Sequence, residues 1–208
     1  HKSNSNEHPK TGVSGFSLIE QTSDLCLSCH DKIKKKIVSS PYVHQALNDK
    51  KSCINCHSPH SSTEKNLLVA NKREVCFSCH NKTIATHSKT ISNIEQQYNN
   101  SEVKHPPFKK CSSSCHNPHA SDYHHLLSNT FPDNEYAPAS VDSFALCFEC
   151  HDIDLVAKDI TSTATNFRNG AKNLHYVHVH GEKGRVCTMC HSPHATNNEY
   201  LIKDKAGF

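Results

Sequence analysis

Residues 53–60 read Cys-Ile-Asn-Cys-His-Ser-Pro-His, and this stretch contains the pattern that recurs along the rest of the chain. Two cysteines stand three positions apart, and a histidine directly follows the second one. Two thiols on one short turn can add to the two vinyl groups of a single porphyrin, while the adjoining imidazole faces the iron from the same side. The pentapeptide C-x-x-C-H is the attachment signature of c-type haem.

The same arrangement occurs six times in the 208 residues and uses all 12 cysteines. The cysteine pairs are Cys26 and Cys29, Cys53 and Cys56, Cys76 and Cys79, Cys111 and Cys115, Cys147 and Cys150, and Cys187 and Cys190. The histidines that follow them are His30, His57, His80, His116, His151 and His191. Five motifs read C-x-x-C-H, whereas the fourth reads C-S-S-S-C-H and needs a bulged turn. The repetition predicts six covalently attached haem c groups, each with its motif histidine on the iron.

Two other uses of cysteine fit this pattern poorly. A disulfide framework needs no histidine after every second cysteine, and cysteines so close in sequence rarely bridge with good geometry. Zinc sites draw two such pairs for each metal and do not require a Cys-His dipeptide at every pair. Thioether attachment of haem takes place outside the cytoplasmic membrane. The motifs therefore predict an exported protein, and a first residue that is His1 rather than Met fits a removed signal peptide.

The composition agrees with a protein rich in cofactors. Only 35% of the residues are hydrophobic, whereas 12 are cysteine and 19 are histidine, so an ordinary side-chain core is not expected. No apolar run approaches the roughly 18 residues of a membrane span. The formal net charge of +3 gives no reason to expect a nucleic-acid partner. Two ionised propionates on each haem would bring the holoprotein to roughly −9 to −3, depending on the oxidation state of the irons.

The six motifs alternate between two types that differ in their flanking residues. First-type motifs begin at Cys26, Cys76 and Cys147 and are followed by Asp or Asn. Second-type motifs begin at Cys53, Cys111 and Cys187 and are followed by Ser-Pro-His or Asn-Pro-His. Seven positions beyond that last histidine begin the apolar pairs Leu67-Leu68, Leu126-Leu127 and Leu201-Ile202. The alternation predicts an N-terminal arm at 1–15 and three two-haem units at 16–70, 71–130 and 140–208.

With these doubled motifs the chain resembles the multihaem c-type cytochromes, a family that includes low-potential tetrahaem carriers and the cytochromes of extracellular electron-conducting filaments. The resemblance covers nearly the whole chain, and widened motifs such as C-S-S-S-C-H occur in the family too. It implies low-spin haems with two histidine ligands each, closely stacked and passing electrons from one to the next.

The repeat itself selects candidates for the second axial ligand among the histidines outside the motifs. Three of them lie three residues after a motif histidine: His60, His119 and His194. Three others lie six or nine residues before a second-type motif: His44, His105 and His178. Six candidates for six irons predict bis-histidine ligation throughout. A methionine ligand is disfavoured because the single methionine, Met189, lies inside a motif.

The length of the tether suggests which iron each candidate reaches. A histidine three residues after a motif histidine has too little chain to circle its own porphyrin. We therefore expect His60, His119 and His194 on the first-type haem of their own unit. The upstream candidates have longer loops and are expected on the second-type haem of their own unit. The other histidines near the repeats are interpreted as surface or propionate-bonding residues: His87, His124, His125, His175 and His180.

The polar N-terminal arm carries two further histidines, His1 and His8. Filament-forming members of the family give an axial histidine across the subunit boundary. By that resemblance His8 is the first choice for an inter-subunit ligand and His1 the second, within a homopolymer of this chain.

The predicted fold class is mostly irregular with short α-helices, a stacked haem chain and little or no β-sheet. About 35 residues per haem leave little room for sheets, and strand-like alternation is absent. Helical turns are expected at 75–82 and 143–153, and loops rich in Asn, Ser and Thr at 86–101, 128–140 and 160–173. Because porphyrin faces replace side-chain packing, we expect the apoprotein to be largely unfolded.

These features favour an electron-transfer protein over an enzyme. Reduction of a substrate at iron needs an open coordination position, whereas six distal candidates suffice for six irons. The predicted role is the repeating subunit of an extracellular or cell-surface cytochrome filament, or nanowire. Its expected partners are further copies of the chain, redox-partner cytochromes and extracellular electron acceptors. A soluble periplasmic electron shuttle is the alternative, and a multihaem reductase is the less favoured one.

Overall fold

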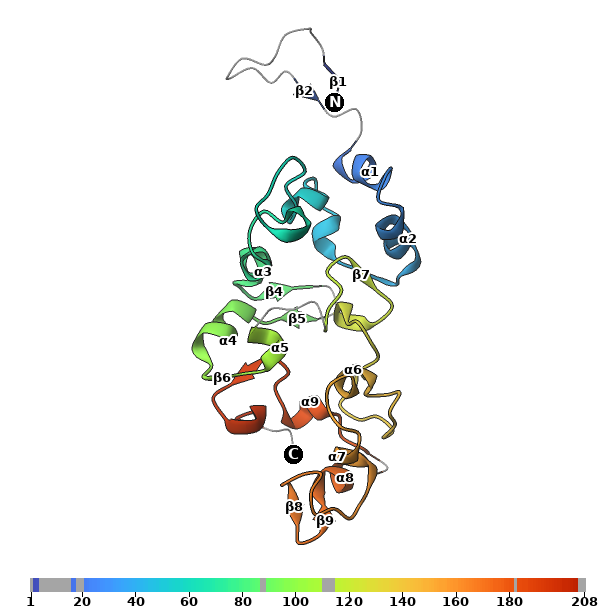
Figure 1. Cartoon of the computed structure of the whole chain (residues 1–208), viewed down its shortest axis with the longest axis vertical. Coiled ribbons are helices and arrows are strands. Elements are labelled where there is room, and N and C mark those ends of the chain that lie inside the picture. Colours follow the sequence, from blue (N-terminus) through green and yellow to red (C-terminus); the bar gives the residue numbers. More distant parts are fainter. Residues whose placement is uncertain are drawn as a thin grey trace.

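The computed structural model of the chain is elongated, with the described residues 2–3 and 16–17 at one end and residues 150–180 at the other (Figure 1). Residues 187–205 turn back toward the middle of the molecule. The structure describes residues 2–3, 16–17, 21–86, 89–109, 115–181 and 183–205. His1, His8, His87 and Cys111 lie outside these ranges.

The described helices are short. The α-helices are α1 (Thr22–Leu27), α2 (Asp31–Ser39), α3 (Lys72–His80), α4 (Ile94–Asn100), α5 (Pro106–Lys109), α6 (Ala145–Phe148), α7 (Asp154–Ala157), α8 (Leu174–Val179) and α9 (Cys187–Cys190). The 3₁₀ helices are η1 (Gln45–Leu47), η2 (Ser52–Asn55), η3 (Lys65–Leu67), η4 (His124–Leu126) and η5 (Glu199–Leu201).

The described strands have two residues each and form antiparallel two-stranded sheets. They are β1 (Lys2–Ser3), β2 (Phe16–Ser17), β3 (Tyr42–Val43), β4 (Ile84–Ala85), β5 (Thr90–Ile91), β6 (Val103–Lys104), β7 (Ala120–Ser121), β8 (Arg168–Asn169), β9 (Lys172–Asn173) and β10 (Ala195–Thr196). The sheets pair β1 with β2, β3 with β7, β4 with β5, β6 with β10, and β8 with β9.

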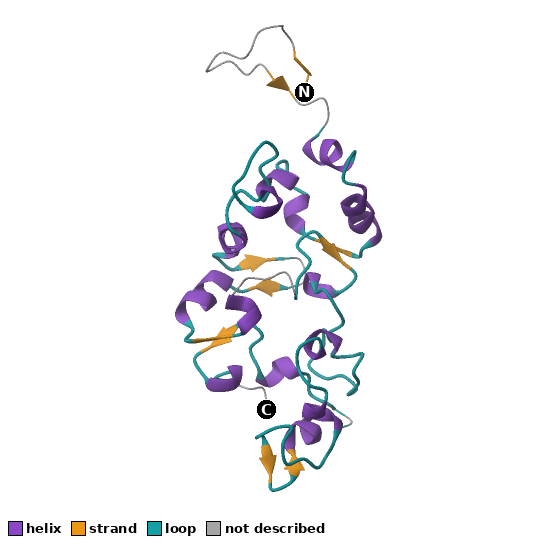
Figure 2. Cartoon of the chain, viewed as in Figure 1, coloured by secondary structure: helices purple, strands orange, loops and turns teal. Residues whose placement is uncertain are grey.

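The predicted fold class is confirmed, since loops predominate between these short elements (Figure 2). The helix expected at 75–82 corresponds to α3, which begins earlier because the side chain of Asn71 accepts the amide of Glu74 at 3.1 Å and caps it. The prediction of a loop over residues 86–101 was wrong in part, because α4 lies within this range. That helix is capped in the same way by Asn93, which accepts the amide of Gln96 at 2.8 Å.

Each second-type motif opens a hairpin that is the same in all three repeats. The amide after the motif histidine donates to the first residue of the apolar pair at 2.7 Å: Ser58 to Leu67, Asn117 to Leu126 and Ser192 to Leu201. The motif histidine forms a β-bridge with the second residue of the pair: His57 with Leu68, His116 with Leu127 and His191 with Ile202. The conserved spacing of the apolar pairs thus reflects the closing point of a backbone hairpin.

The tip of each hairpin turns through two residues with left-handed backbone. These residues are Asn66 and Leu67, His125 and Leu126, and Tyr200 and Leu201, with φ between 54° and 62°. Non-glycine residues rarely adopt this conformation, and asparagine and histidine do so more readily than most. The turn holds the carbonyl of its first residue against the motif histidine, as described below.

The polypeptide does not fill its own interior. Its accessible surface is 14561 Å², whereas a compact chain of 23.2 kDa would expose about 9,700 Å². Among the described residues, one hydrophobic cluster is well buried, and it surrounds Phe144, Val179 and Val186. The open scaffold is the form expected of a chain that folds around large apolar groups.

Asn173 organises the end of the molecule that carries α8. Its side chain is fully buried and caps this helix by accepting the amides of His175 at 3.0 Å and Tyr176 at 3.3 Å. Its amide group donates to the carbonyls of Leu155 at 3.0 Å and Lys158 at 2.9 Å. One side chain thereby joins α7, the following turn and α8.

We predict that Asn173→Ala lowers the free energy of unfolding by about 2–4 kcal/mol, because a helix cap is lost and two buried carbonyls lose their donor. Urea unfolding of the holoprotein, followed by far-ultraviolet circular dichroism, measures the change. Asn169→Ala, on the exposed strand β8, is the matched control and should leave the midpoint unchanged. Equal midpoints for the two variants would contradict this role of Asn173.

Candidate functional site

The described attachment motifs lie on helical turns or at their ends. First-type motifs lie at the ends of α1, α3 and α6, and second-type motifs in η2 and α9. The amide of the motif histidine donates to the carbonyl of the first cysteine: His30 to Cys26 at 3.1 Å, His57 to Cys53 at 3.1 Å, His151 to Cys147 at 3.0 Å and His191 to Cys187 at 3.0 Å. Residues three apart on a helical turn share a face. The two thiols therefore lie on one side, as attachment to a single porphyrin requires.

Five motif histidines have a second imidazole stacked opposite them. The pairs are His80 with His44 at 6.3 Å between ring centroids, His57 with His119 at 6.1 Å, His151 with His105 at 6.1 Å, His116 with His194 at 6.3 Å, and His191 with His175 at 6.2 Å. The ring planes of these pairs are within 11–29° of parallel.

This separation is too large for direct ring contact and fits a metal ion between the rings. Two collinear metal–nitrogen bonds of about 2.0–2.1 Å, with about 1.1 Å from each nitrogen to its ring centre, put the centres about 6.2–6.4 Å apart. The observed pairs span 6.1–6.3 Å. The residues present thus fit haem groups whose iron has an imidazole on each face.

Hydrogen bonds to backbone carbonyls fix the orientation of these rings. In the three hairpins the Nδ1 of the motif histidine donates to the residue at the tip: His57 to Asn66 at 2.9 Å, His116 to His125 at 2.9 Å and His191 to Tyr200 at 2.8 Å. The Nδ1 of His44 donates to Pro118 at 3.0 Å and that of His105 to Pro193 at 3.1 Å. A proton on Nδ1 leaves the lone pair of Nε2 for a metal, which is the usual outer arrangement of ligating histidines.

The surroundings of the opposing rings favour the neutral imidazole that binds metals. Burial lowers the pKa of His44, His119 and His175. Burial, with a smaller contribution from the neighbouring His116, lowers the pKa of His194 to about 4. These rings are therefore unprotonated at neutral pH.

The stacked pairs join different units from those we expected. His44 and His105 face the first-type motif histidine that follows them, rather than the second-type one in their own unit. His119 and His194 face the second-type motif histidine of the preceding unit, rather than a first-type one. Strand pairing is the physical reason, because it sets two candidates side by side. The amide of His44 donates to the carbonyl of His119 at 3.0 Å, and that of His105 to His194 at 2.9 Å.

At the last motif the structure brings His175 to His191, and not the expected His178. Both histidines lie on α8, but the Nδ1 of His178 donates back to the carbonyl of Leu174 at 2.6 Å. The asparagine cap of α8 fixes its rotation and so decides which ring points at His191. The offset of nine residues before Cys187 pointed to His178, whereas the ring that stacks on His191 is that of His175. In the sequence, Asn173 is the residue that indicates where α8 begins.

For the other predicted haem ligands and attachment cysteines, the structure shows no stacked imidazole pair or describes only part of the motif. Among the described residues, no imidazole stacks on His30, the histidine of the first motif. His60 is exposed, whereas His119 and His194 are partly buried. Cys115 is described, but Cys111 and the three serines between them are not.

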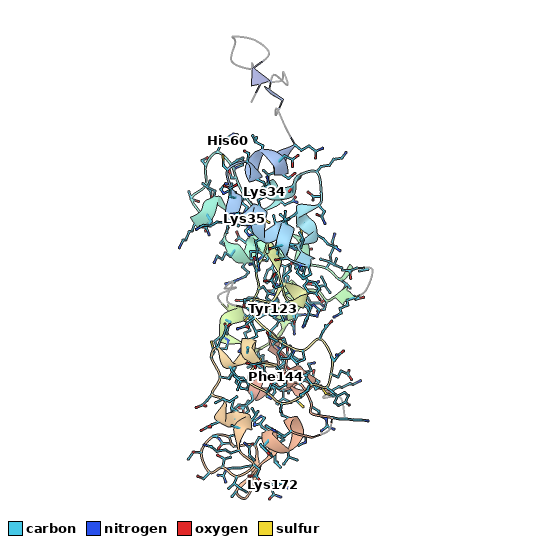
Figure 3. The ribbon with its side chains drawn as sticks, turned by 90° about the vertical axis from the view of Figure 1, so that its right-hand side faces the viewer. Lys34, Lys35, His60, Tyr123, Phe144 and Lys172 are labelled. Atoms are coloured by element: carbon cyan, nitrogen blue, oxygen red, sulfur yellow. The ribbon has the colours of Figure 1, made fainter. Side chains whose placement is uncertain are left out.

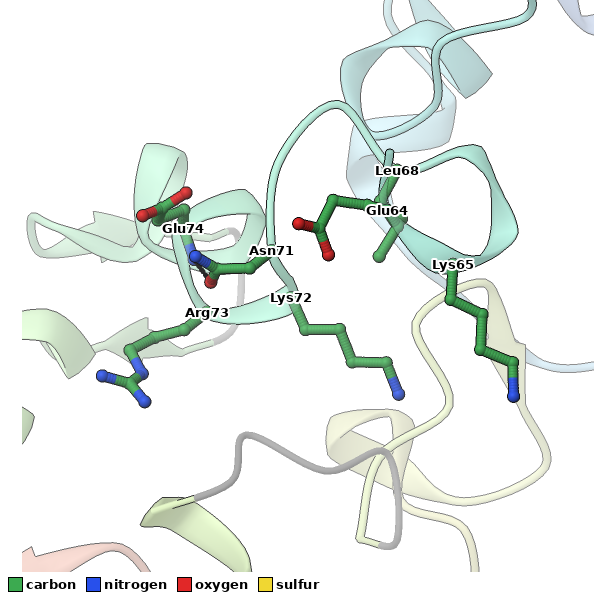
Figure 4. Close-up of a pocket in the computed structure, with 7 residues that line it drawn as sticks. All are labelled: Glu64, Lys65, Leu68, Asn71, Lys72, Arg73 and Glu74. Atoms are coloured by element: carbon green, nitrogen blue, oxygen red, sulfur yellow. Dashed lines mark hydrogen bonds between the residues drawn. The ribbon is translucent and has the colours of Figure 1, made fainter. Parts of the chain in front are cut away.

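A separate pocket lies at the start of α3 (Figure 4). It has a volume of about 470 Å³ and is lined by Glu64, Lys65, Leu68, Asn71, Lys72, Arg73 and Glu74. The lining contains no cysteine or histidine, so this pocket is distinct from the haem centres.

Comparison with known proteins supports the same assignment. The family model for the doubled CXXCH motif matches residues 44–85 and 105–154. Each matched segment begins at a histidine paired in the structure, His44 or His105, and contains a second-type motif followed by a first-type motif. This grouping of motifs differs from the units that we predicted, which begin with a first-type motif.

The chain is also similar to the multihaem cytochrome MtrA of Shewanella baltica, with 29% identity over 135 residues. The similarity covers 64% of this chain and 32% of MtrA, so the chain spans about a third of that relative. In the part of the chain that the structure describes, every helix is too short or too polar to span a bilayer.

The cysteine turns, the facing imidazoles and these similarities agree on one conclusion. The CXXCH motifs are sites of covalent haem c attachment, and the chain carries the doubled CXXCH motif of multihaem c-type cytochromes and is distantly similar to MtrA.

Proposed function

We propose that the chain is a hexahaem electron carrier with bis-histidine haems, and that it forms the repeating subunit of an extracellular filament. The observation that carries the first part is the recurrence of imidazole pairs at 6.1–6.3 Å. When bound, the haems supply reversible one-electron chemistry at iron. The chain's own residues attach the porphyrins, occupy both faces of the iron and orient the ligands.

The ligand set we propose keeps four of the six sequence-based distal candidates: His44, His105, His119 and His194. His175 takes the place of His178, and His60 is not assigned to an iron. Two imidazoles on one iron give low-potential, low-spin centres with no free coordination position. Substrate reduction would require such a position, so this ligation argues for a carrier rather than a reductase.

Contacts between neighbouring motifs support an electron path that follows the order of the motifs in the sequence. The side chains of successive motifs lie near one another. The neighbouring residues are Cys26 and Cys53, Cys56 and Cys79, His80 and His116, Cys115 and Cys147, and Cys147 and Cys187. Within the 208 residues this path runs without branching from Cys26 to Cys187.

The first motif supports a filament. Among the described residues, no imidazole stacks on His30, whereas the three second-type motif histidines each already face one. The first motif lies toward one end of the body: α1, which carries Cys26, lies at the end opposite α8 (Figure 1), and Figure 3 shows His60 at the end opposite Lys172. We propose that a second copy of the chain gives the first haem its second imidazole, with His8 as the first choice and His1 as the second.

His8 and His1 both lie outside the described residues. A filament subunit would be secreted to the cell surface. A soluble electron shuttle with the same haem ligands would work in the periplasm.

The ligand at the last motif can be tested with two variants three residues apart on α8. We predict that reduced His175→Ala binds about one more carbon monoxide per chain than the wild type, because the iron held by His191 loses its second imidazole. His178→Ala should bind no more than the wild type and is the matched control. Titration followed in the Soret band measures both. The reverse result, with an open site only in His178→Ala, would contradict the proposed ligand.

Polymerisation is tested by negative-stain microscopy and sedimentation of the holoprotein over a series of concentrations. We predict fibres for the wild type and a marked loss of fibres for His8→Ala, because the ligand between copies is removed. His180→Ala removes an exposed histidine of the body and should polymerise as the wild type does. Discrete particles of wild type at every concentration would overturn the filament and favour the periplasmic shuttle, while the carbon monoxide result would stand independently.

A further inference from the structure

A cluster of metal-binding side chains lies beside the tip of the middle hairpin, outside the haem ligand set. His124 and His125 come from η4, and Asp133 comes from the loop that follows. The Nδ1 of His124 and the Nε2 of His125 each lie 3.4 Å from the same carboxylate oxygen, Oδ1 of Asp133. One ligand atom from each residue fits within 4.8 Å of the other two.

These separations match the spacing of ligands around a small metal ion. Ligand atoms at 2.0–2.1 Å from a tetrahedral zinc ion lie about 3.3–3.4 Å from one another. Both measured distances to Asp133 are 3.4 Å. Two imidazoles and a carboxylate are a donor set that Zn²⁺ and similar divalent ions accept, with water completing the coordination.

The ring of His124 is already oriented as a metal ligand. Its Nε2 donates to the carbonyl of Phe131 at 2.6 Å, and its Nδ1 faces Asp133. That Nδ1 is buried, and among the described residues it has no hydrogen-bond partner. A buried polar atom without a partner is unfavourable, and a metal ion at this position would satisfy it. The donor bond to a backbone carbonyl is the outer contact that ligating histidines usually make.

The ammonium group of Lys89 lies beside Asp133 and His125, where a metal ion would bind. Lys89 Nζ forms an ion pair with Asp133 and lies 3.4 Å from His125 Nε2. Its side chain is 44% exposed, so it can swing into solvent when a metal ion enters. Burial and the charge of Lys89 lower the pKa of His125, and the hydrogen bond from Lys89 lowers the pKa of Asp133. Neutral imidazole and ionised carboxylate are the forms that bind metals.

The hairpin does not need these imidazoles for its own architecture. The first repeat has Lys65-Asn66 at the positions of His124-His125, and the third has Glu199-Tyr200. All three tips nevertheless have the same left-handed backbone and the same carbonyl bond to the motif histidine. The two histidines are therefore an addition specific to the middle repeat.

We propose that His124, His125 and Asp133 bind a divalent metal ion of the zinc class, which displaces the ammonium of Lys89. The site adjoins a haem centre, because the carbonyl of His125 is the group that accepts the Nδ1 hydrogen of His116. The inference does not depend on the filament or on the number of haems.

Equilibrium dialysis of the oxidised holoprotein against Zn²⁺ at pH 7.5, after treatment with a chelator, tests the site. The first repeat provides a mild variant, because His125→Asn introduces the residue that adopts the same backbone at Asn66. We expect His125→Asn and Asp133→Asn to weaken the tightest zinc site by about tenfold or more. Lys89→Met should tighten it, because the competing cation is gone.

His180→Asn, at an exposed histidine outside the cluster, should bind zinc as the wild type does and controls for adventitious binding. Unchanged Soret spectra verify that each variant keeps its haems. Equal zinc binding by the wild type, His125→Asn and Asp133→Asn would overturn the proposal. So would an absence of zinc binding by the wild type at millimolar concentration, or weaker binding by Lys89→Met.

Discussion

Two imidazole rings held face to face at 6.1–6.3 Å are the constraint to which most of the described backbone conforms. The rings of a pair come from segments far apart in the chain, and short antiparallel sheets set their register. Sheet β3–β7 places His44 beside His119, and sheet β6–β10 places His105 beside His194. Strand pairs of two residues have little stability of their own in water. The sheets and the ring pairs therefore depend on each other.

The shortage of hydrophobic residues has a structural counterpart. A chain with 35% hydrophobic residues exposes far more surface than a compact protein of its mass, and in the part that the structure describes one hydrophobic cluster, around Phe144, is well buried. Elsewhere the order comes from backbone hairpins, asparagine caps and the carbonyl bonds of the motif histidines. These interactions orient the backbone and the histidine rings but bury little apolar surface. The attached porphyrins therefore have to supply most of the apolar contact.

The sequence predicted the features that depend on local spacing and missed those that depend on register between units. The cysteine turns, the fold class and the set of histidines worth considering follow from offsets of a few residues. The partner of each histidine does not, because His44 meets His80 and His119 meets His57 only after strands from different repeats have paired. The stacking of His175 rather than His178 on His191 depends on the rotation of α8, which the buried cap residue Asn173 sets. The prediction missed α4 because its composition is typical of a loop. The cap residue Asn93 was the main feature of the sequence that indicated a helix there.

The interlocking of successive hairpins has a consequence for how such a chain can change in length. The middle repeat gives one imidazole to the repeat ahead and one to the repeat behind, and it receives one from each, so the exchange is balanced where a repeat has neighbours on both sides. A whole repeat can then be duplicated or deleted without disturbing the pairing inside the chain. At the last of the six motifs the second imidazole, that of His175, comes from the same repeat as His191. Selection can therefore set the distance that electrons travel by copying one segment, without redesigning any haem pocket.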